Sequence, residues 1–179
     1  MPVIQTLSLT SLDELIARFF QNSQGSWSSE RRYYTLPEGK VQEMVSAITV
    51  RYLAPGNAEL IQLAELHKLN DLEVLTCGAE VTWDSQNSIL GKQMSKGRTL
   101  FGAKGNILYR DRGFATTDPV SARVTFTNPD TMTLRTEYNS SVFEEEVKLI
   151  GTRYRTRQTI ISRAGEQQMI GQYLEKRIN

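Results

Sequence analysis

The sequence has little of what several common classes of protein require. Its 179 residues include one cysteine and one histidine, which excludes an internal disulfide and gives no cluster of metal ligands. The formal charge of +1 offers no electrostatic case for nucleic acid or a membrane surface as the main partner. No apolar run approaches a membrane span, and the N-terminus lacks the basic flank and apolar core of a signal peptide. We therefore expect a cytoplasmic protein without membrane insertion and without a metal site.

What the sequence does contain is alternation of apolar and polar residues with a period of two, which is typical of half-buried β-strands. Turn-forming residues such as Gly105-Asn106 and Asn128-Pro129-Asp130 separate the strands. The predicted strands cover residues 27–36, 41–53, 73–83, 99–103, 107–110, 120–126, 131–138 and 167–176, with two more within 142–157 and a polar loop at 91–97. About ten short strands with tight connections predict an all-β, antiparallel barrel that closes or nearly closes around one small ligand.

Two helices are predicted beside the strands. Ser11 and Glu14 fit a capping box at the start of the first. Its apolar positions follow helical spacing at Leu12, Leu15, Ile16, Phe19 and Phe20. We expect this helix to cover one end of the barrel. A short inserted helix is predicted over Ala58–Leu69, with His67 at the boundary of its packed face.

The hairpin over Val142–Arg157, VFEEEVKLIGTRYRTR, carries the most informative pattern in the chain. Period-two alternation places one carboxylate, Glu145, within an otherwise apolar face of the first strand. After a turn at Gly151, the second strand carries arginines at spacing two, namely Arg153, Arg155 and Arg157. If the turn sets Glu145 across from Arg155, the hairpin offers a pocket for an acidic ligand that also presents N–H donors, because arginine binds carboxylates in a bidentate fashion.

Two other interpretations of this hairpin remain open at the level of sequence. The arginines form a solvated outer face in the first, since buried arginine is rare unless it is paired. In the second, a register shift of one residue groups them with Glu144 and Glu146 instead of Glu145.

The segment that opens the first strand resembles known families. Gly25-Ser26-Trp27 is similar to the Gly-x-Trp signature of lipocalin-like barrels. The longer run Phe19–Leu36, FFQNSQGSWSSERRYYTL, closely resembles the start of the S/U-type phycobiliprotein lyases, the CpcS/CpeS family. The resemblance covers nearly the whole chain and continues through Val41-Gln42-Glu43, Ser46-Ala47-Ile48-Thr49-Val50, Val81-Thr82-Trp83 and Arg153-Tyr154-Arg155-Thr156.

This resemblance implies a fold and an activity. The fold is a lipocalin or fatty-acid-binding-protein-like barrel, here as one domain over residues 1–179. The activity is binding of an open-chain tetrapyrrole (a bilin, with phycocyanobilin as the leading candidate) and its thioether attachment to a cysteine of a phycobiliprotein subunit. The bilin is a substrate, and no permanently bound cofactor is implied. Such a protein works in the cyanobacterial cytosol or plastid stroma.

The resemblance also assigns residues. Glu145 and Arg155 match the family's glutamate and arginine pair, and Arg153 is a second arginine on that hairpin. The arginines, together with Arg31 of the first strand, would clamp the bilin propionates, and Glu145 would accept hydrogen bonds from pyrrole N–H groups. Trp83 would pack on a pyrrole ring or close the barrel floor.

One position departs from the family pattern and bears on partners. Many members carry a histidine where this chain has Tyr34, which makes Tyr34 a further candidate for the bilin site. Some members work only as half of a heterodimer, so activity alone, as a homodimer, or with a paralogous lyase subunit all remain open. An accessory subunit without turnover, or a carrier of a small apolar acid, are the alternative functions. Cys77 is expected to be a buried apolar residue, because it lies on the apolar face of its strand and has no histidine nearby in sequence. The resemblance implies that the attacking thiol belongs to the acceptor, so Cys77 need not take part.

Overall fold

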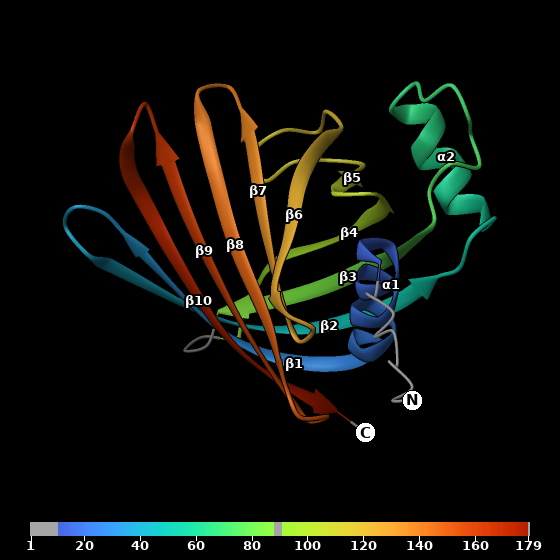
Figure 1. The fold of residues 1–179 in the computed structure, drawn as a ribbon. Helices are drawn as coiled ribbons and strands as arrows, with labels where there is room; N and C mark the ends of the chain where they lie inside the picture. The colour runs from blue at the N-terminus through green and yellow to red at the C-terminus, as the bar shows by residue number, and fades with distance from the viewer. Residues whose placement is uncertain (1–10, 88–90, 179) are drawn as a thin grey trace, which may run out of the picture.

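Ten antiparallel strands close into a barrel in the part of the chain that is described, and two helices accompany them (Figure 1). The computed structural model describes residues 11–87 and 91–178. The strands are β1 Gly25–Thr35, β2 Lys40–Leu53, β3 Cys77–Asn87, β4 Gln93–Lys104, β5 Ile107–Arg110, β6 Val120–Asn128, β7 Thr131–Tyr138, β8 Ser141–Ile150, β9 Tyr154–Arg163 and β10 Glu166–Ile178. Each pairs with its neighbours in sequence, and β1 pairs with β10 to close the ring. The predicted all-β antiparallel barrel is confirmed.

Helix α1, Leu12–Ser23, lies at one end of the barrel, as expected (Figure 1). The Ser11 side chain accepts a hydrogen bond from the Glu14 backbone N–H at 3.2 Å, which satisfies one of the free donors of the first turn. The buried face of α1 joins the main core through Ile16, Phe19 and Phe20. The aromatic rings of this face fill the end of the barrel at which β1 begins.

Helix α2 packs on the outer surface of the barrel and is shorter than predicted. It covers Ala58–Leu66 rather than ending at residue 69, because the backbone at Lys68 has a φ of 56° and cannot continue a helix. Leu60 and Leu63 of α2 pack directly against two glycines of the sheet. A Cβ built on Gly78 would lie 2.6 Å from Leu60 Cδ2, and one on Gly102 would lie 2.9 Å from Leu63 Cδ2. This contact forms a second apolar cluster outside the barrel.

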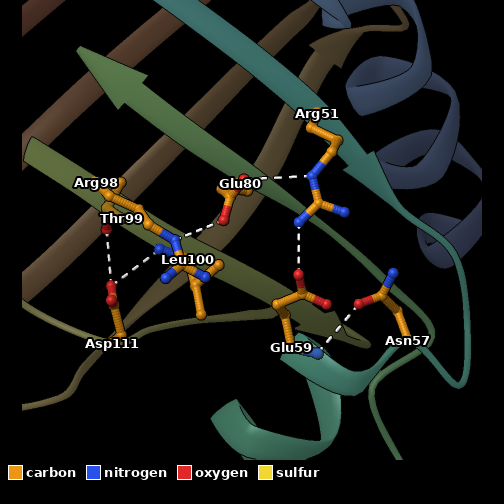
Figure 2. Close-up of polar contacts among 8 residues, drawn as sticks. All are labelled: Arg51, Asn57, Glu59, Glu80, Arg98, Thr99, Leu100 and Asp111. Atoms are coloured by element: carbon orange, nitrogen blue, oxygen red, sulfur yellow. Dashed lines mark hydrogen bonds and ion pairs between the residues drawn. The ribbon is translucent and has the colours of Figure 1, made fainter. Parts of the chain in front are cut away.

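Charged residues tie α2 to three strands (Figure 2). Arg51 of β2 lies 2.6 Å from the Glu59 carboxylate of α2 and 3.2 Å from the Glu80 carboxylate of β3. Arg98 of β4 contacts Glu80 from the other side at 2.5 Å. The Asn57 side chain caps α2 by accepting from the Glu59 N–H. These contacts fix α2 against the sheet that forms the cavity wall.

Three strands differ from the prediction by four residues or more at a boundary, and one of them is β9, which runs to Arg163 rather than Arg157. Strand β3 begins at Cys77, whereas the alternation predicts a strand from residue 73. Most of the predicted polar loop at 91–97 belongs to β4, where Gly97 pairs with Trp83 and Ser95 with Ser85. The polarity of this segment reflects exposure of the strand at the open end of the barrel rather than a break in the ladder. None of the described helices is long and apolar enough to cross a membrane.

Candidate ligand-binding site

The interior of the barrel contains a cavity of about 280 Å³. One end of it is bounded by Phe19 and Phe20 of α1, and the walls come from the inward faces of the strands. Five arginines and one glutamate line this otherwise apolar and aromatic space: Arg31, Arg110, Arg112, Arg155, Arg157 and Glu145. Positive charge is therefore in excess inside the cavity.

The hairpin of β8 and β9 has the predicted face but a different register. Glu145 and Arg155 are both buried, with 8% and 6% of their surfaces exposed, and both line the cavity. Direct pairing of the two was wrong, because Glu145 faces Thr159 and Arg155 faces Leu149. The loop consists of Gly151, Thr152 and Arg153, so the hairpin is centred on Thr152. Pairing Glu145 with Arg155 would have centred it on Ile150.

The same register excludes the two other interpretations of the hairpin. Glu144 and Glu146 are exposed on the outer face. Glu144 Oε1 lies 2.8 Å from Arg135 Nη1 rather than near the arginines of β9. Those arginines do not form a solvated outer face either, because Arg155 is buried and Arg157 is partly buried.

The partner of Arg155 is a glutamate that no sequence pattern marks. Arg155 Nε donates to Glu175 Oε1 at 2.7 Å, and Arg157 Nη1 lies 3.8 Å from Glu175 Oε2. Burial alone would raise the pKa of Glu175, but Arg157 and Arg155 outweigh it and lower that pKa. The Arg155 guanidinium also lies 4.8 Å from the centre of the Trp27 ring. This cluster is a fixed, ionised layer near the α1 end of the cavity.

A second layer lies one step nearer the open end. Arg31 pairs with Tyr173, which pairs with Arg157 across β1, β10 and β9. The guanidinium carbons of Arg31 and Arg157 lie 5.3 Å and 4.9 Å from the centre of the Tyr173 ring. Tyr33 meets that ring edge-on at 5.6 Å. Burial raises the pKa of Tyr173, so its hydroxyl is neutral at physiological pH. The Tyr173 ring makes cation–π contacts with both arginines.

Glu145 has its own cationic neighbour on the opposite wall. Arg110, at the end of β5, places Nη1 3.5 Å from Glu145 Oε1. Its guanidinium lies between two aromatic rings, 4.9 Å from the centre of Phe101 and 4.6 Å from that of Phe114. Burial lowers the pKa of Arg110, an effect that Glu145 opposes.

Trp83 forms part of the cavity wall. Its Nε1 donates to Ser95 Oγ at 3.0 Å, and its ring crosses β4 at Gly97, where a Cβ would lie 2.5 Å from the indole. The Arg112 guanidinium carbon lies 5.6 Å from the centre of the Trp83 ring. Helix α1, rather than Trp83, closes the end of the barrel. The indole lines the cavity wall, where it is placed to contact a ligand.

Two of the predicted site residues are not brought to the cavity. Arg153 lies exposed in the β8–β9 loop, outside the strand. Tyr34 does not line the cavity, because its neighbour Tyr33 occupies the inward position on β1. Arg31, Trp83, Glu145 and Arg155 do line it.

Four functional candidates were not predicted as site residues: Arg110, Arg112, Arg157 and Glu175. Arg157 is visible in the alternation of the hairpin, which could have identified it. Glu175 lies two residues after the cavity-lining Tyr173, so alternation places both on the inward face of the last strand. Nothing in the sequence marks Glu175 as the partner of Arg155. Arg110 ends a strand of four residues, too short to establish a face.

Neither a metal-binding cluster nor a reactive cysteine nucleophile is found among the described residues. No group of three or more histidine, cysteine, aspartate or glutamate side chains among them is arranged to hold a metal ion. Cys77 is fully buried, and burial together with Asp13 raises the pKa of its thiol to about 12. Such a thiol is a poor nucleophile. His67 follows the end of α2, with Nε2 donating to the Arg110 carbonyl at 2.8 Å.

Comparisons with known proteins agree with this architecture. Residues 15–178 match the family described as CpeS-like protein. A Nostoc protein with the provisional name phycocyanobilin lyase CpcS 2 is 61% identical over 178 residues, covering 99% of both chains. A Picosynechococcus protein provisionally named chromophore lyase CpcV is 46% identical over 161 residues, covering 89% of this chain and 80% of its own. The solved structure of the S-type phycobiliprotein lyase CpeS from Guillardia theta superposes with a TM-score of 0.76 at 20% identity, covering 92% and 93% of the chains.

Proposed function

The chain belongs to the CpeS-like family, and on that premise we propose that it is a chromophore lyase. It binds an open-chain tetrapyrrole and promotes thioether attachment of that bilin to a cysteine of a phycobiliprotein subunit. Phycocyanobilin is the proposed substrate, since the relative that is 61% identical is named for it. The chain acts as one barrel domain in the cytosol or stroma where phycobiliproteins are assembled.

The observation that carries the proposal is the charge inside the cavity. Five arginines and one glutamate line a space whose other surfaces are largely apolar and aromatic. Buried charge is costly unless it is paired. A bilin supplies what this space lacks, because its two propionates are anions, its pyrrole N–H groups are donors and its conjugated system is flat and apolar.

The two layers support the following assignment of the parts of the ligand. Arg31 and Arg157 flank Tyr173 and are placed to bind propionates, while Glu175 holds Arg155 beneath them. Trp83 offers its ring to the conjugated system. The cavity volume of about 280 Å³ lies at the low end of ligand pockets, roughly 300–1,000 Å³. A bilin therefore extends toward the open end, where a thiol from another protein can reach it.

The chemical step is an addition that needs no oxidant. The acceptor thiolate forms a bond to the exocyclic ethylidene carbon of the bilin, the carbon–carbon double bond opens, and a proton adds at the neighbouring ring carbon. Glu145, as an acceptor near the pyrrole N–H groups, favours the protonated chromophore and so makes the ethylidene carbon more electrophilic. The contribution of the barrel is positioning and electrostatic stabilisation. Cys77 takes no part.

The test compares inward and outward residues that are neighbours in sequence. Glu145→Gln and Arg31→Gln alter the cavity, whereas Glu144→Gln and Arg32→Gln alter the exposed outer face of the same strands. Each variant is mixed with phycocyanobilin, its absorption spectrum is recorded, and an apo-phycobiliprotein subunit is then added. We expect a red-shifted band and a covalent, zinc-fluorescent product with wild type and both controls, and a transfer rate lower by about tenfold or more with the inward variants, as the loss of a hydrogen bond to a charged group predicts.

Three other results have clear meanings. Equal transfer by inward and outward variants would remove these residues from the site. Binding without transfer by wild type would favour an accessory subunit that needs a paralogous partner. The absence of any spectral change with wild type would refute bilin binding and favour a carrier of another apolar acid.

A further inference from the structure

The pair formed by Arg110 and Glu145 differs in charge from the rest of the cavity. Arg155, Arg157 and Glu175 carry a net positive charge, as does Arg31 beside them, and so suit a carboxylate. Arg110 and Glu145 together are neutral, with nitrogen and oxygen 3.5 Å apart. An anion bound there would face Glu145, and a cation would face Arg110. The pair therefore suits an uncharged polar group.

The pair is also incompletely hydrogen-bonded. Arg110 Nε and Nη1 and Glu145 Oε1 are buried and have no hydrogen-bond partner among the described residues. Both side chains are more than nine-tenths buried and line the cavity. A buried charged group without a hydrogen bond is costly, so the missing partners are expected from a ligand. Those partners are an acceptor for Arg110 and a donor for Glu145, side by side.

Contacts with neighbouring side chains fix the position of Arg110. Its guanidinium carbon lies 4.9 Å from the ring centre of Phe101 and 4.6 Å from that of Phe114. Phe114 is in turn stacked on Phe143 with ring centres 4.8 Å apart. The backbone carbonyl of Arg110 accepts from His67 Nε2 at 2.8 Å. The guanidinium is thus fixed from several sides, and the ligand must present its groups to it.

We propose that Arg110 and Glu145 together bind a terminal lactam ring of the open-chain tetrapyrrole. Arg110 donates to the lactam carbonyl, and Glu145 accepts from the lactam N–H of the same ring. A lactam is neutral and carries its donor and acceptor on adjacent atoms, which is the complement that this pair lacks. The inference rests on the proposed function and deepens it, since it makes Arg110 the residue that sets which part of the bilin lies against the β5 wall.

The test alters the protein and the ligand together. The ligands are phycocyanobilin and its two mono-O-methyl lactim ethers, each of which has lost the N–H and the carbonyl of one terminal ring. The proteins are wild type, Arg110→Met and Arg110→Lys, with Arg123→Met as a control at an outward position of β6. Dissociation constants come from absorption titrations, and thermal unfolding of each variant reports its folding.

We expect wild type and the Arg123 control to bind one of the two ethers about tenfold or more weakly than phycocyanobilin, as the loss of hydrogen bonds to charged groups predicts. The identity of that ether tells which terminal ring is held. Arg110→Met should bind phycocyanobilin more weakly and should discriminate less than wild type, because its thioether offers no strong donor to the lactam carbonyl, while Glu145 still accepts from the lactam N–H. A variant that is merely damaged would lose affinity for all three ligands equally, and Arg110→Lys provides the same comparison if the methionine variant does not fold.

Two outcomes would overturn the inference, and they have different consequences for the proposed lyase function. If wild type binds all three bilins equally, or if Arg110→Met and Arg110→Lys discriminate as strongly as wild type, the lactam is not held here, and the lyase function is unaffected. If wild type binds no bilin at all, the inference and the proposed function fail together.

Discussion

Replacing Glu175 by glutamine tests whether the buried layer at the α1 end is organised as described. Glu175 is fully buried, with Arg155 Nε at 2.7 Å and Arg157 Nη1 at 3.8 Å from its carboxylate oxygens. Removing one partner of a buried ion pair costs about 3–5 kcal/mol, because the remaining charge is left uncompensated. Two cations are left here, so we expect a loss of about 4–5 kcal/mol in the free energy of unfolding at pH 7.

Urea denaturation of the ligand-free protein measures this loss. Glu166→Gln, an exposed position at the start of the same strand, is the matched control and should change stability by less than about 0.5 kcal/mol. A loss below about 1 kcal/mol for Glu175→Gln would refute the reasoning, because a carboxylate that compensates two buried guanidinium groups cannot be dispensable.

The same carboxylate gives a pH signature. The pKa of Glu175 is lower in the folded protein than its ordinary value, since Arg157 and Arg155 outweigh the effect of burial. Its contribution to stability is complete above the ordinary carboxyl pKa of about 4.3, and it is lost as the pH falls below that value toward the folded pKa. Wild type should therefore lose stability more steeply than Glu175→Gln in acid, and parallel profiles for the two proteins would contradict this.

Three further predictions concern other parts of the barrel. Gly97→Ala should destabilise the protein by about 1–3 kcal/mol and shift the Trp83 fluorescence, because the added methyl meets the indole at 2.5 Å; an unchanged emission spectrum would contradict the close contact. Cys77 should react with a thiol reagent only on unfolding, since it is buried and its pKa is raised to about 12; rapid labelling of the native protein would count against this. Arg51→Ala breaks an exposed network on α2 (Figure 2) and should cost no more than about 1 kcal/mol in urea denaturation, with a larger loss indicating that α2 contributes more than surface ion pairs normally do.

The strand pattern of this chain was largely predictable, because alternation fixes which residues share a face. Alternation pointed to Glu145 and Arg155, the family resemblance added Arg31 and Trp83, and all four line the cavity. The capped helix at the N-terminus was equally predictable, and its Ser11 makes the expected contact with the Glu14 N–H.

Register and partners were not predictable in the same way. Moving the β8–β9 pairing by an even number of residues, here four, preserves every inward and outward assignment, so alternation could not decide whether Glu145 faces Arg155 or Thr159. The loop at Gly151–Arg153 decides it, and that loop also removes Arg153 from the strand. Glu175 lies directly opposite Arg155 in the β9–β10 pair, and alternation does not fix that register either. Arg110 of β5 reaches Glu145 of β8 across the inside of the barrel, a contact that depends on the curvature of the whole sheet.

The correction at Tyr34 has a simple physical origin. The resemblance matched the residue by its position in sequence, but adjacent residues on a strand point to opposite faces. Tyr33 takes the inward place and meets Tyr173 at 5.6 Å. A role for Tyr34 in binding a bilin directly is therefore not supported by its position on β1.

The closed order of the strands restricts how another protein can recognise this one. Within the described residues each strand pairs with two others and β1 is bonded to β10, so no strand has a wholly free side (Figure 1). Strand β5 is short, however, and pairs with β4 only over Phe101–Lys104, so residues 93–100 of β4 have no strand partner on that side. Strand addition, a common way for proteins to capture extended peptides, is therefore confined to the short unpaired stretches beside β5. Over the rest of the ring, an acceptor subunit must identify the barrel by the shape and chemistry of its side chains and connecting loops, because the backbone hydrogen bonds of the strands are already made there.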